Sequence, residues 1–302
     1  MKASISVTAF FLLYTYGCFG QVKWTNVDSA YNPLPRGLHI FKTTDSLDGA
    51  PNIAFYAVAD LKSKNLSFTV DTTFKRRLTP SRFFEKNNKP VLVVNGTFFS
   101  FETNQNLNLV VKNGKIVAHN VRKIKSKTGD TTVFKDEPVV KGVLGINKKR
   151  QADIAWISSD STSLYASEWQ QPTPGAHKKK PWKMRTAIGG GPVLIQDGKI
   201  FIANNEEKMF AGKGISDKHP RTCIGYTKDH KLIIMVIQGR FPGVAEGASL
   251  QHEAQMLLDL GCVEALNLDG GGSSCLLING KGTITPSDKG LQRAVPAVFL
   301  IN

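Results

Sequence analysis

The stretch ALNLDGGGSSCLLINGKGTI, residues 265–284, contains the pattern that decides the fold class. An apolar run leads into a glycine-rich break, a second apolar run follows, and Asn279-Gly280 then turns the chain back. Asn-Gly between apolar runs is typical of a type I′ β-hairpin, because both central residues of that turn need positive φ. The stretch therefore predicts strand, break, strand, turn and strand.

The same design recurs in two other stretches of the chain. Residues 91–119 turn at Asn113-Gly114, and residues 186–203 turn at Asp197-Gly198. A strand-like run follows each of the two triple glycines, whereas a nucleotide-binding glycine loop opens a helix. The glycines therefore do not indicate a P-loop or a dinucleotide fingerprint. Two further hairpins are predicted, at 221–239 with a turn near Lys228–His230, and at 143–158 with a turn near Lys148–Gln151.

Helical patterns are few, and the clearest covers residues 247–262. Ser249 is a suitable N-cap and Gly261 a suitable C-terminal stop. The apolar residues between them fall on one stripe at helical spacing, and Glu253 lies on the same inward stripe. A carboxylate that faces a core costs free energy unless it is paired or functional. A second, short helix is predicted within residues 81–90.

These elements predict an α+β fold in a single domain: mixed, mainly antiparallel strands and hairpins with a few packed helices. Of the 302 residues, 41% are hydrophobic, and no shift in composition marks a second domain. The formal charge of 39 − 24 = +15 favours anionic partners such as phosphates or acidic glycans. A nucleic-acid partner is not predicted, because no zinc-finger spacing, RNA-binding signature or heptad repeat occurs. Residues 173–183 have the composition of an exposed basic loop.

The first residues have the features of a secretory signal. One lysine precedes an apolar stretch from Val7 to Tyr16, which is too short to span a membrane, and small residues follow it. We expect a signal peptide at 1–20, an N-terminal extension at 21–50, and an exported protein that is periplasmic or extracellular. Lipidation at Cys18 is the alternative, and no later apolar run is long enough for a transmembrane span. The other cysteines lack metal-ligand spacing and are expected to be buried: Cys223, Cys262 and Cys275.

Two carboxylates are candidates for chemistry. Asp269 follows an apolar strand and precedes three glycines, so its side chain projects from a strand end into a turn. The N–H groups of Gly270, Gly271 and Gly272, with the hydroxyls of Ser273 and Ser274, are suited to form an anion-binding nest. The alternative for Asp269 is a structural Asx-turn, and the alternative for Glu253 is an ion pair with an arginine. If the two carboxylates converge, different surroundings would let them divide acid and base roles.

Cationic side chains flank the same motifs. Arginine presents a planar fork of donors that suits phosphate oxygens, and histidine titrates near neutral pH. Each residue alone is equally consistent with a surface, ion-pairing or loop role, so their convergence on one cleft is the feature that would matter. The candidates are Arg185, His219, Arg221, Arg240 and Arg293.

Taken in order, seven motifs resemble the phosphodiester glycosidase family over residues 50 to 302. The most specific of them is LNLDGGGSS with the helix before it. This chain departs from the family pattern at Cys275 and Leu276, and at His252 and Ala254 on either side of Glu253. The motifs are NGTFF (95–99), RTAIGGGPVLIQDGK (185–199), HPRTCIGY (219–226), QGR (238–240), GASLQHEAQMLLDLG (247–261), LNLDGGGSS (266–274) and QRAVPAVFLI (292–301).

The resemblance implies a catalytic domain at 51–302 that hydrolyses the bond between a sugar's anomeric carbon and a phosphodiester, with N-acetylglucosamine as one candidate sugar. Asp269 and Glu253 are then the expected catalytic residues, with a sugar phosphate or phosphoglycan as substrate. No cofactor is required, although the resemblance leaves room for a structural or substrate-associated Ca²⁺ or Mg²⁺. The expected substrate-binding residues are Asn95, Arg185, Gly189, Gly190, Gly191, His219, Arg221, Arg240, Gly270, Gly271, Gly272, Ser273 and Ser274.

Two other functions fit the residues. A non-catalytic binder of anionic glycans or envelope polymers would use the basic surface, with Lys178–Lys180 and Lys183 more important than Asp269. A metal-dependent phosphodiesterase would use Asp269 as a ligand, and the lack of a clustered His/Asp set weighs against it. Loss of activity with a chelator would revive this second alternative.

Overall fold

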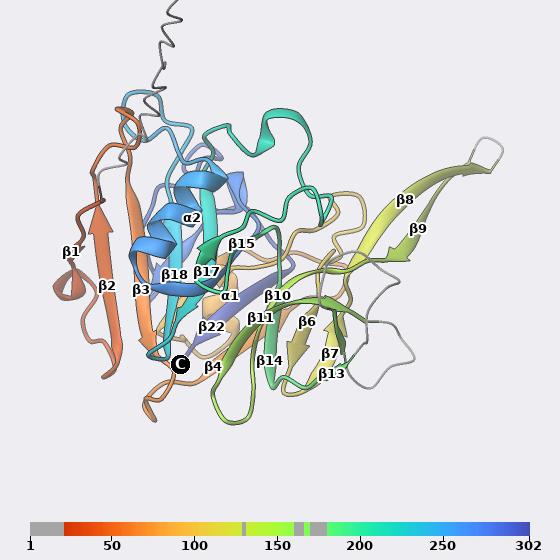
Figure 1. Ribbon diagram of the computed structural model, residues 1–302, viewed down its shortest axis with the longest axis horizontal. Helices are drawn as coiled ribbons and strands as arrows, with labels where there is room; N and C mark the ends of the chain where they lie inside the picture. The colour runs from red at the N-terminus through yellow and green to blue at the C-terminus, as the bar shows by residue number, and fades with distance from the viewer. Residues whose placement is uncertain (1–20, 129–130, 160–165, 170–179) are drawn as a thin grey trace, which may run out of the picture.

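The computed structural model describes residues 21–128, 131–159, 166–169 and 180–302. Within these residues, three antiparallel β-sheets of eight, seven and five strands surround a common core, and a two-stranded hairpin projects from them (Figure 1). The α+β prediction with mainly antiparallel strands is confirmed. Residues 1–20, predicted as a signal peptide, lie outside the described residues. In the described part, no helix is long and apolar enough to cross a membrane.

The eight-stranded sheet carries the candidate site at one end of its central strands. Its strands pair in the order β1-β2-β3-β18-β17-β19-β15-β16. Residues 21–50, expected as an extension, contribute β1 and β2 to this sheet. The strands are β1 (Thr25–Asn26), β2 (Leu38–Thr43), β3 (Ala54–Asp60), β18 (Lys231–Ile237), β17 (Arg221–Thr227), β19 (Cys262–Asn267), β15 (Val193–Gln196) and β16 (Lys199–Ile200).

The other sheets pack against the face of this sheet that is opposite helix α2. The seven-stranded sheet contains β13 (Lys180–Trp182), β12 (Ala166–Trp169), β11 (Ala152–Ser158), β10 (Lys141–Ile146), β14 (Thr186–Gly189), β6 (Val110–Lys112) and β7 (Lys115–Ala118). The five-stranded sheet contains β21 (Lys281–Gly282), β20 (Leu276–Ile278), β5 (Leu92–Asn95), β22 (Ala297–Ile301) and β4 (Phe68–Thr72). The projecting hairpin pairs β8 (Val121–Thr128) with β9 (Thr131–Pro138).

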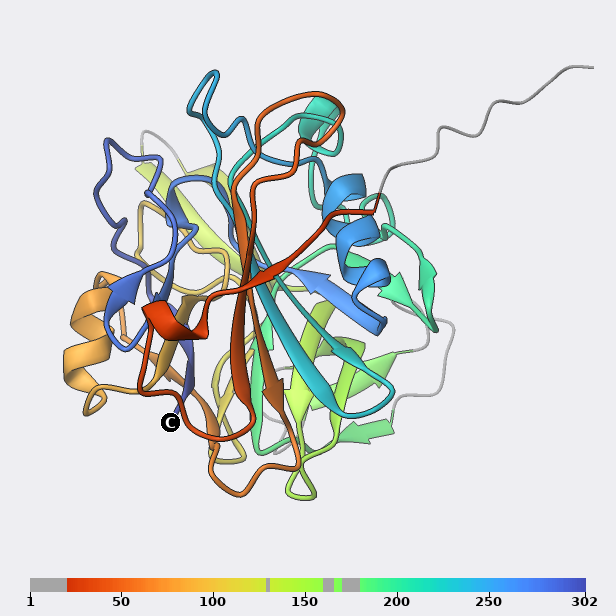
Figure 2. The same ribbon diagram turned by 90° about the vertical axis from the view of Figure 1, so that its left-hand side faces the viewer.

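Strand β18 shows why the core has two layers. After Lys231 its sequence LIIMVI is apolar at every position, and successive side chains of a strand point to opposite faces. Leu232, Ile234 and Val236 enter the central core between the sheets. Ile233 and Met235 enter a second core under helix α2 (Leu250–Asp259). Helix α2 contacts β15, β16, β17 and β19 of this sheet, and Figure 2 shows it in blue beside them.

The predicted helices and turns are present. Ser249 caps α2 and forms a capping box with His252, and Gly261 has a φ of 82° just past the helix end. The predicted helix at 81–90 is α1 (Pro80–Lys86), capped by Thr79, and it covers the five-stranded sheet. The Asn-Gly and Asp-Gly turns have positive φ at both residues, as a type I′ hairpin requires: Asn113-Gly114, Asp197-Gly198 and Asn279-Gly280.

One predicted loop is partly a strand. Residues 180–182 form β13 instead of an exposed loop, because Trp182 is only 4% exposed and its indole donates a hydrogen bond to Asp153. Residues 173–179 lie outside the described residues. The three cysteines are buried free thiols, as expected.

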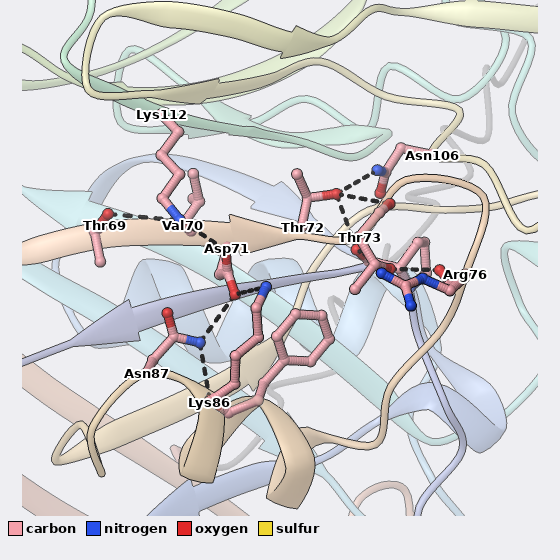
Figure 3. Close-up of polar contacts among 12 residues, drawn as sticks. Thr69, Val70, Asp71, Thr72, Thr73, Arg76, Lys86, Asn87, Asn106 and Lys112 are labelled. Carbon is pink, nitrogen blue, oxygen red and sulfur yellow. Dashed lines mark hydrogen bonds and ion pairs between the residues drawn. The ribbon is translucent and has the colours of Figure 1, made fainter.

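Asp71 of β4 joins two of the sheets and α1 through one carboxylate (Figure 3). Its Oδ1 accepts from Lys112 of β6 at 2.7 Å, and its Oδ2 accepts from Lys86 at 2.6 Å and from Asn87 at 3.0 Å. Burial raises the pKa of Asp71, but these three donors outweigh burial and the net pKa is lowered. The cluster is therefore a structural clamp at the edge of the five-stranded sheet.

Candidate functional site

The backbone of Asp269 is fixed where β19 ends between two other strands. Beyond Asn267, the Leu268 amide donates to the Thr222 carbonyl at 2.8 Å, and the Asp269 amide donates to the Gly96 carbonyl at 3.0 Å. The Asn95 side chain donates to the Asp269 carbonyl at 2.5 Å. Segments from β5 and β17 thus place Asp269, and its position does not depend on the glycines that follow.

Asn95 is the residue that joins these segments. It is fully buried, and its Oδ1 accepts from the Thr222 hydroxyl at 3.0 Å and from the Cys275 amide at 3.0 Å. With its Nδ2 on the Asp269 carbonyl, both ends of this amide are used inside the protein. The structure therefore gives Asn95 a positioning role for Asp269, whereas direct contact with substrate stays a prediction.

Asp269 is a half-buried residue, and one oxygen of its carboxylate lacks a hydrogen-bond partner in the part of the chain that the structure describes. Its Oδ2 is inaccessible and meets no hydrogen-bond partner among the described residues. Burial raises its pKa to about 7, opposed by the neighbouring Ser273 hydroxyl, the charge of Arg293 and the Gly270 amide. The Ser273 and Ser274 hydroxyls are also buried and unpartnered in this part of the structure, and no standard hydrogen bond joins Ser273 to Asp269. Unsatisfied buried polar atoms are costly, so their concentration in one loop indicates a ligand site.

Two guanidinium groups lie against the glycine loop. Gly271 has a φ of 60°, and a Cβ there would stand 3.0 Å from Nη2 of Arg240. At Gly272 a Cβ would overlap the Arg293 guanidinium, so only glycine allows this approach. Arg293 is held by Asp288 at 2.7 and 2.8 Å, whereas Arg240 is exposed and makes no side-chain ion pair in the described residues.

The loop itself provides a smaller anion nest than the sequence predicts. A 3₁₀ turn at Gly271–Ser273 precedes β20, and the Gly271 amide already donates to the Pro220 carbonyl at 2.8 Å. The Gly270 amide acts on the Asp269 carboxylate. The guanidinium groups of Arg240 and Arg293 are therefore the main positively charged groups beside this loop.

His219 and Arg221 flank the loop on its other side. The Nδ1 of His219 is buried without a partner among the described residues, and its pKa is lowered by burial and by the charges of Arg221 and Arg240. Arg221 is 4% exposed and donates to three backbone carbonyls, those of Gly214, Asp217 and Ala248. Arg221 thus ties the loop before β17 to the start of α2.

Glu253 is fully buried on the inward face of α2, where the sequence places it. Neither of its carboxylate oxygens has a hydrogen-bond partner among the described residues. Burial raises its pKa to about 8, and the charge of Arg221 and the neighbouring Cys223 thiol only partly oppose this. The alternative of a structural ion pair with an arginine is not formed, since no such contact joins Glu253 to Arg221.

The two carboxylates have separate surroundings. Arg221 and Cys223 lower the pKa of Glu253, whereas Arg293 and groups of the glycine loop lower the pKa of Asp269. The segment that carries Arg221 links the two, because a Cβ at Gly270 would lie 3.7 Å from the Arg221 Cα. Burial raises both pKa values toward neutrality, the range in which catalytic acids and bases operate.

The other triple glycine packs behind Asp269. The Gly191 amide and carbonyl bond to Asn267 at 2.7 Å each, and the Gly190 carbonyl accepts from Asn108 at 3.0 Å. All three glycines are buried, with the Gly189 amide bonded to Leu109. They support the end of β19, and a direct contact with substrate stays a prediction.

Arg185 is not brought to this group. It precedes β14, whose other end carries Gly189, so the two are separated by about 13 Å of extended chain. Its side chain is exposed, and its carbonyl accepts from Gly114 in the β6–β7 turn. The structure thus separates Arg185 from His219, Arg221, Arg240 and Asp269.

The sequence does not predict the roles of two acids, Glu207 and Asp288. Glu207 is 3% exposed and accepts hydrogen bonds from Val193, Trp156 and Gly142 behind the 189–191 glycines. Asp288 orients Arg293, which the sequence marks only as flanking a motif. Neither acid lies in a patterned element, so no periodicity signals them. In the described residues, no group of three His, Cys, Asp or Glu side chains is placed to hold a metal ion.

Comparisons with known proteins identify the family of the chain. A sequence model of the phosphodiester glycosidase family matches residues 88–302, so the chain belongs to that family. Bovine N-acetylglucosamine-1-phosphodiester alpha-N-acetylglucosaminidase is 31% identical over 109 residues, which are 33% of this chain and 20% of the bovine protein. The prophage-derived uncharacterized protein YomE of Bacillus subtilis is 34% identical over 118 residues, 39% of this chain and 17% of that protein. The chain thus spans about a fifth of the length of these relatives.

Solved structures show the same fold over nearly the whole chain. The zebrafish N-acetylglucosamine-1-phosphodiester alpha-N-acetylglucosaminidase catalytic domain superimposes with a TM-score of 0.62 at 21% identity, covering 93% of this chain and 88% of that one. A hypothetical protein from Synechocystis gives a TM-score of 0.61 at 14% identity, covering 93% of this chain and 68% of that one. At these identities the likeness shows the fold.

Proposed function

We propose that the protein is an exported hydrolase that cleaves the bond between a sugar's anomeric carbon and a phosphodiester oxygen. The observation that carries this proposal is the Asp269 carboxylate: it has an unpartnered oxygen and a pKa of about 7, and it lies beside a loop contacted by Arg240 and Arg293. A carboxylate next to guanidinium groups is the arrangement that a sugar phosphodiester requires, with one group for the anomeric carbon and the others for the phosphate.

In this proposal, water is added across the glycosidic bond. The C1–O bond breaks, the oxygen of water joins C1, and the phosphate leaves as a monoester. Asp269 assists at the anomeric carbon as nucleophile or base, which requires its ionised form. Arg240 and Arg293 neutralise the charge that the phosphate gains as it leaves.

We assign Glu253 the acid role. With a pKa of about 8 it is protonated at neutral pH, and it has no partner that would hold the proton. A phosphate leaving group needs little protonation, so the contribution of Glu253 is expected to be smaller than that of Asp269. If Glu253 only positions Arg221, Glu253→Gln should lower turnover by the same factor for substrates with different leaving groups.

The position of bond cleavage tests the reaction. In ¹⁸O-water, a panel of sugar-1-phosphodiesters, including one of N-acetylglucosamine, should give label in the sugar hydroxyl and none in the phosphate. Label in the phosphate would instead support the metal-dependent phosphodiesterase, and a chelator series on the same substrates would then test for Ca²⁺ or Mg²⁺. Asp269→Asn should reduce turnover by about 10³-fold or more, the scale of losing a nucleophile or base. Turnover at the wild-type rate would remove Asp269 from the chemistry.

Export rests on the sequence of residues 1–20 alone. Expression in a bacterial host should yield the protein outside the cytoplasm, beginning at Gln21. Replacing Leu12 and Leu13 by arginine should retain it inside. A wild-type protein that stays in the cytoplasm with residue 1 intact would contradict export without affecting the proposed reaction.

A further inference from the structure

An exposed aromatic residue lies next to the candidate site, between two arginines. The Phe101 side chain is 59% exposed, although large apolar side chains are usually covered. The Arg293 guanidinium lies over its ring at 5.5 Å from the centroid, and the Arg77 guanidinium lies over it at 5.3 Å. Phe99 supports the pair from below, since its ring is 4.8 Å from that of Phe101 and 5.3 Å from Arg77.

Contacts connect this group to Asp269 step by step. Arg293 lies against Gly272 and lowers the pKa of Asp269, so one of the two guanidiniums belongs to the site already described. Phe101 contacts Arg293, and Arg77 contacts Phe101. Arg77 is therefore the next positive charge beyond Arg293 along this side of the site.

The two arginines differ in their counter-ions. Arg293 is paired with Asp288, so its charge is already balanced in part. Arg77 makes no hydrogen bond or ion pair within the described residues, and its contacts there are with the rings of Phe99 and Phe101. A guanidinium over an aromatic ring keeps its in-plane N–H donors available, so Arg77 remains a competent anion binder.

We infer that Arg77, Phe101 and Arg293 form a subsite for a second anionic group, a phosphate or carboxylate, on the far side of the scissile phosphodiester. This inference rests on the proposed function and specifies its substrate: a sugar phosphodiester whose other substituent carries a further negative charge. Phe101 lies between the two positive charges, and Arg77 selects the charged substituent.

Kinetics on two matched substrates test the subsite. Both are the same sugar-1-phosphodiester, one esterified with propanol and the other with 3-phosphopropanol. The wild type should prefer the second in kcat/KM. Arg77→Gln should lower kcat/KM about tenfold for the charged substrate through KM, as expected for loss of a charge-assisted hydrogen bond, and leave the propyl substrate within twofold. Phe101→Leu should reduce the same preference, because Arg77 loses one of the two rings that it lies over.

The adjacent Arg76 provides the matched control. Arg76 is exposed and Arg76→Gln changes the net charge by the same amount, so it should leave the preference unchanged. If Arg76→Gln and Arg77→Gln reduce the preference for the charged substrate equally, the effect is one of net charge, and the subsite is overturned. If Arg77→Gln lowers kcat/KM equally for both substrates, Arg77 stabilises the loop and does not select the substituent, which also overturns the subsite.

A binding measurement separates this inference from the proposed reaction. Tripolyphosphate should bind the wild type more tightly than inorganic phosphate does, and Arg77→Gln should remove most of that difference at constant ionic strength. If the wild type cleaves neither substrate but shows this binding pattern, the proposed reaction fails and the anion subsite stands. If the wild type binds tripolyphosphate no more tightly than inorganic phosphate, the subsite inference is wrong.

Discussion

The guanidinium of Arg293 occupies the space in which a Cβ of residue 272 would stand, so no side chain would fit there. Asp288 pairs with the Nη2 of this guanidinium at 2.7 Å, and its Oδ1 would also overlap a Cβ at residue 272, so the whole ion pair lies against bare backbone. This contact explains the third glycine of the loop in physical terms: its absent side chain is the space that brings a positive charge beside Asp269.

Gly272→Ala should therefore displace Arg293 and damage the site. We expect kcat/KM for a sugar-1-phosphodiester to fall at least tenfold, since a misplaced charge-stabilising group costs about 1.4 kcal/mol or more of transition-state stabilisation. Gly282→Ala is the control, because a Cβ there has its nearest neighbour at 3.8 Å. Unchanged kinetics of Gly272→Ala would show that the position of Arg293 does not matter for activity.

The pH profile of activity should be bell-shaped and narrow. In the proposed reaction Asp269 acts in its ionised form, so activity should rise as pH increases through its pKa of about 7. Glu253 must be protonated, so activity falls as pH increases through its pKa of about 8. Glu253→Gln should remove the alkaline limb and keep the acid limb, measured as kcat/KM from pH 5 to pH 10. An alkaline limb that persists in this variant would assign it to another group.

Asn95 should affect both stability and activity, because one of its hydrogen bonds holds the Asp269 carbonyl. Asn95→Ala leaves the Thr222 hydroxyl, the Cys275 amide and the Asp269 carbonyl without their partner, which should lower the free energy of unfolding by about 3 kcal/mol. Asn95→Asp keeps an acceptor for the first two groups but loses the donor to Asp269. It should therefore recover part of the stability and little of the activity.

Urea denaturation and steady-state kinetics would separate these two effects. Thr222→Val is the matched control, because it removes one of the hydrogen bonds of Asn95 without touching its contact to Asp269. If Asn95→Asp were fully active, its donor to the Asp269 carbonyl would be irrelevant to catalysis.

Asp71 should make the fold sensitive to acid. Its folded pKa is lowered, so its contribution to stability is fully present above its unfolded pKa near 4, and it is lost as pH falls through the folded pKa. Asp71→Asn should lower the free energy of unfolding at pH 7 by about 2 kcal/mol or more, because Lys86 and Lys112 lose their shared acid. The variant should also lose less stability than the wild type between pH 4 and pH 2. Asp60→Asn, which removes the partner of Lys231 alone at a half-buried position, should have a smaller effect.

Local sequence patterns predict the helices, strands and turns of this fold well, but they predict the contacts between distant elements poorly. The Asn113-Gly114 turn and the Ser249 cap depend on residues next to each other in sequence, so propensity alone locates them. Residues 180–182 depend on pairing with β12 and on burial of Trp182, which the basic composition of that stretch conceals. Strands held by distant partners carry little local signal.

The candidate site divides in the same way. Glu253 stands out because an acidic residue interrupts an apolar stripe, and Asp269 stands out because it precedes three glycines. By contrast, the separation of Arg185 from Asp269 depends on the direction of β14, and the role of Asn95 depends on three partners far away in sequence. Sequence periodicity does not predict these distances and contacts, because they arise only when the sheets assemble.

Asn95 also links the site to the folding of the chain. Its three partners lie 174, 127 and 180 residues away along the sequence, so the loop of Asp269 acquires its position only when both halves of the chain have come together. Closing such long loops is entropically costly and slows folding. Recovery of activity during refolding should therefore lag behind the return of β-structure, which makes enzymatic competence a reporter of the last long-range contacts to form.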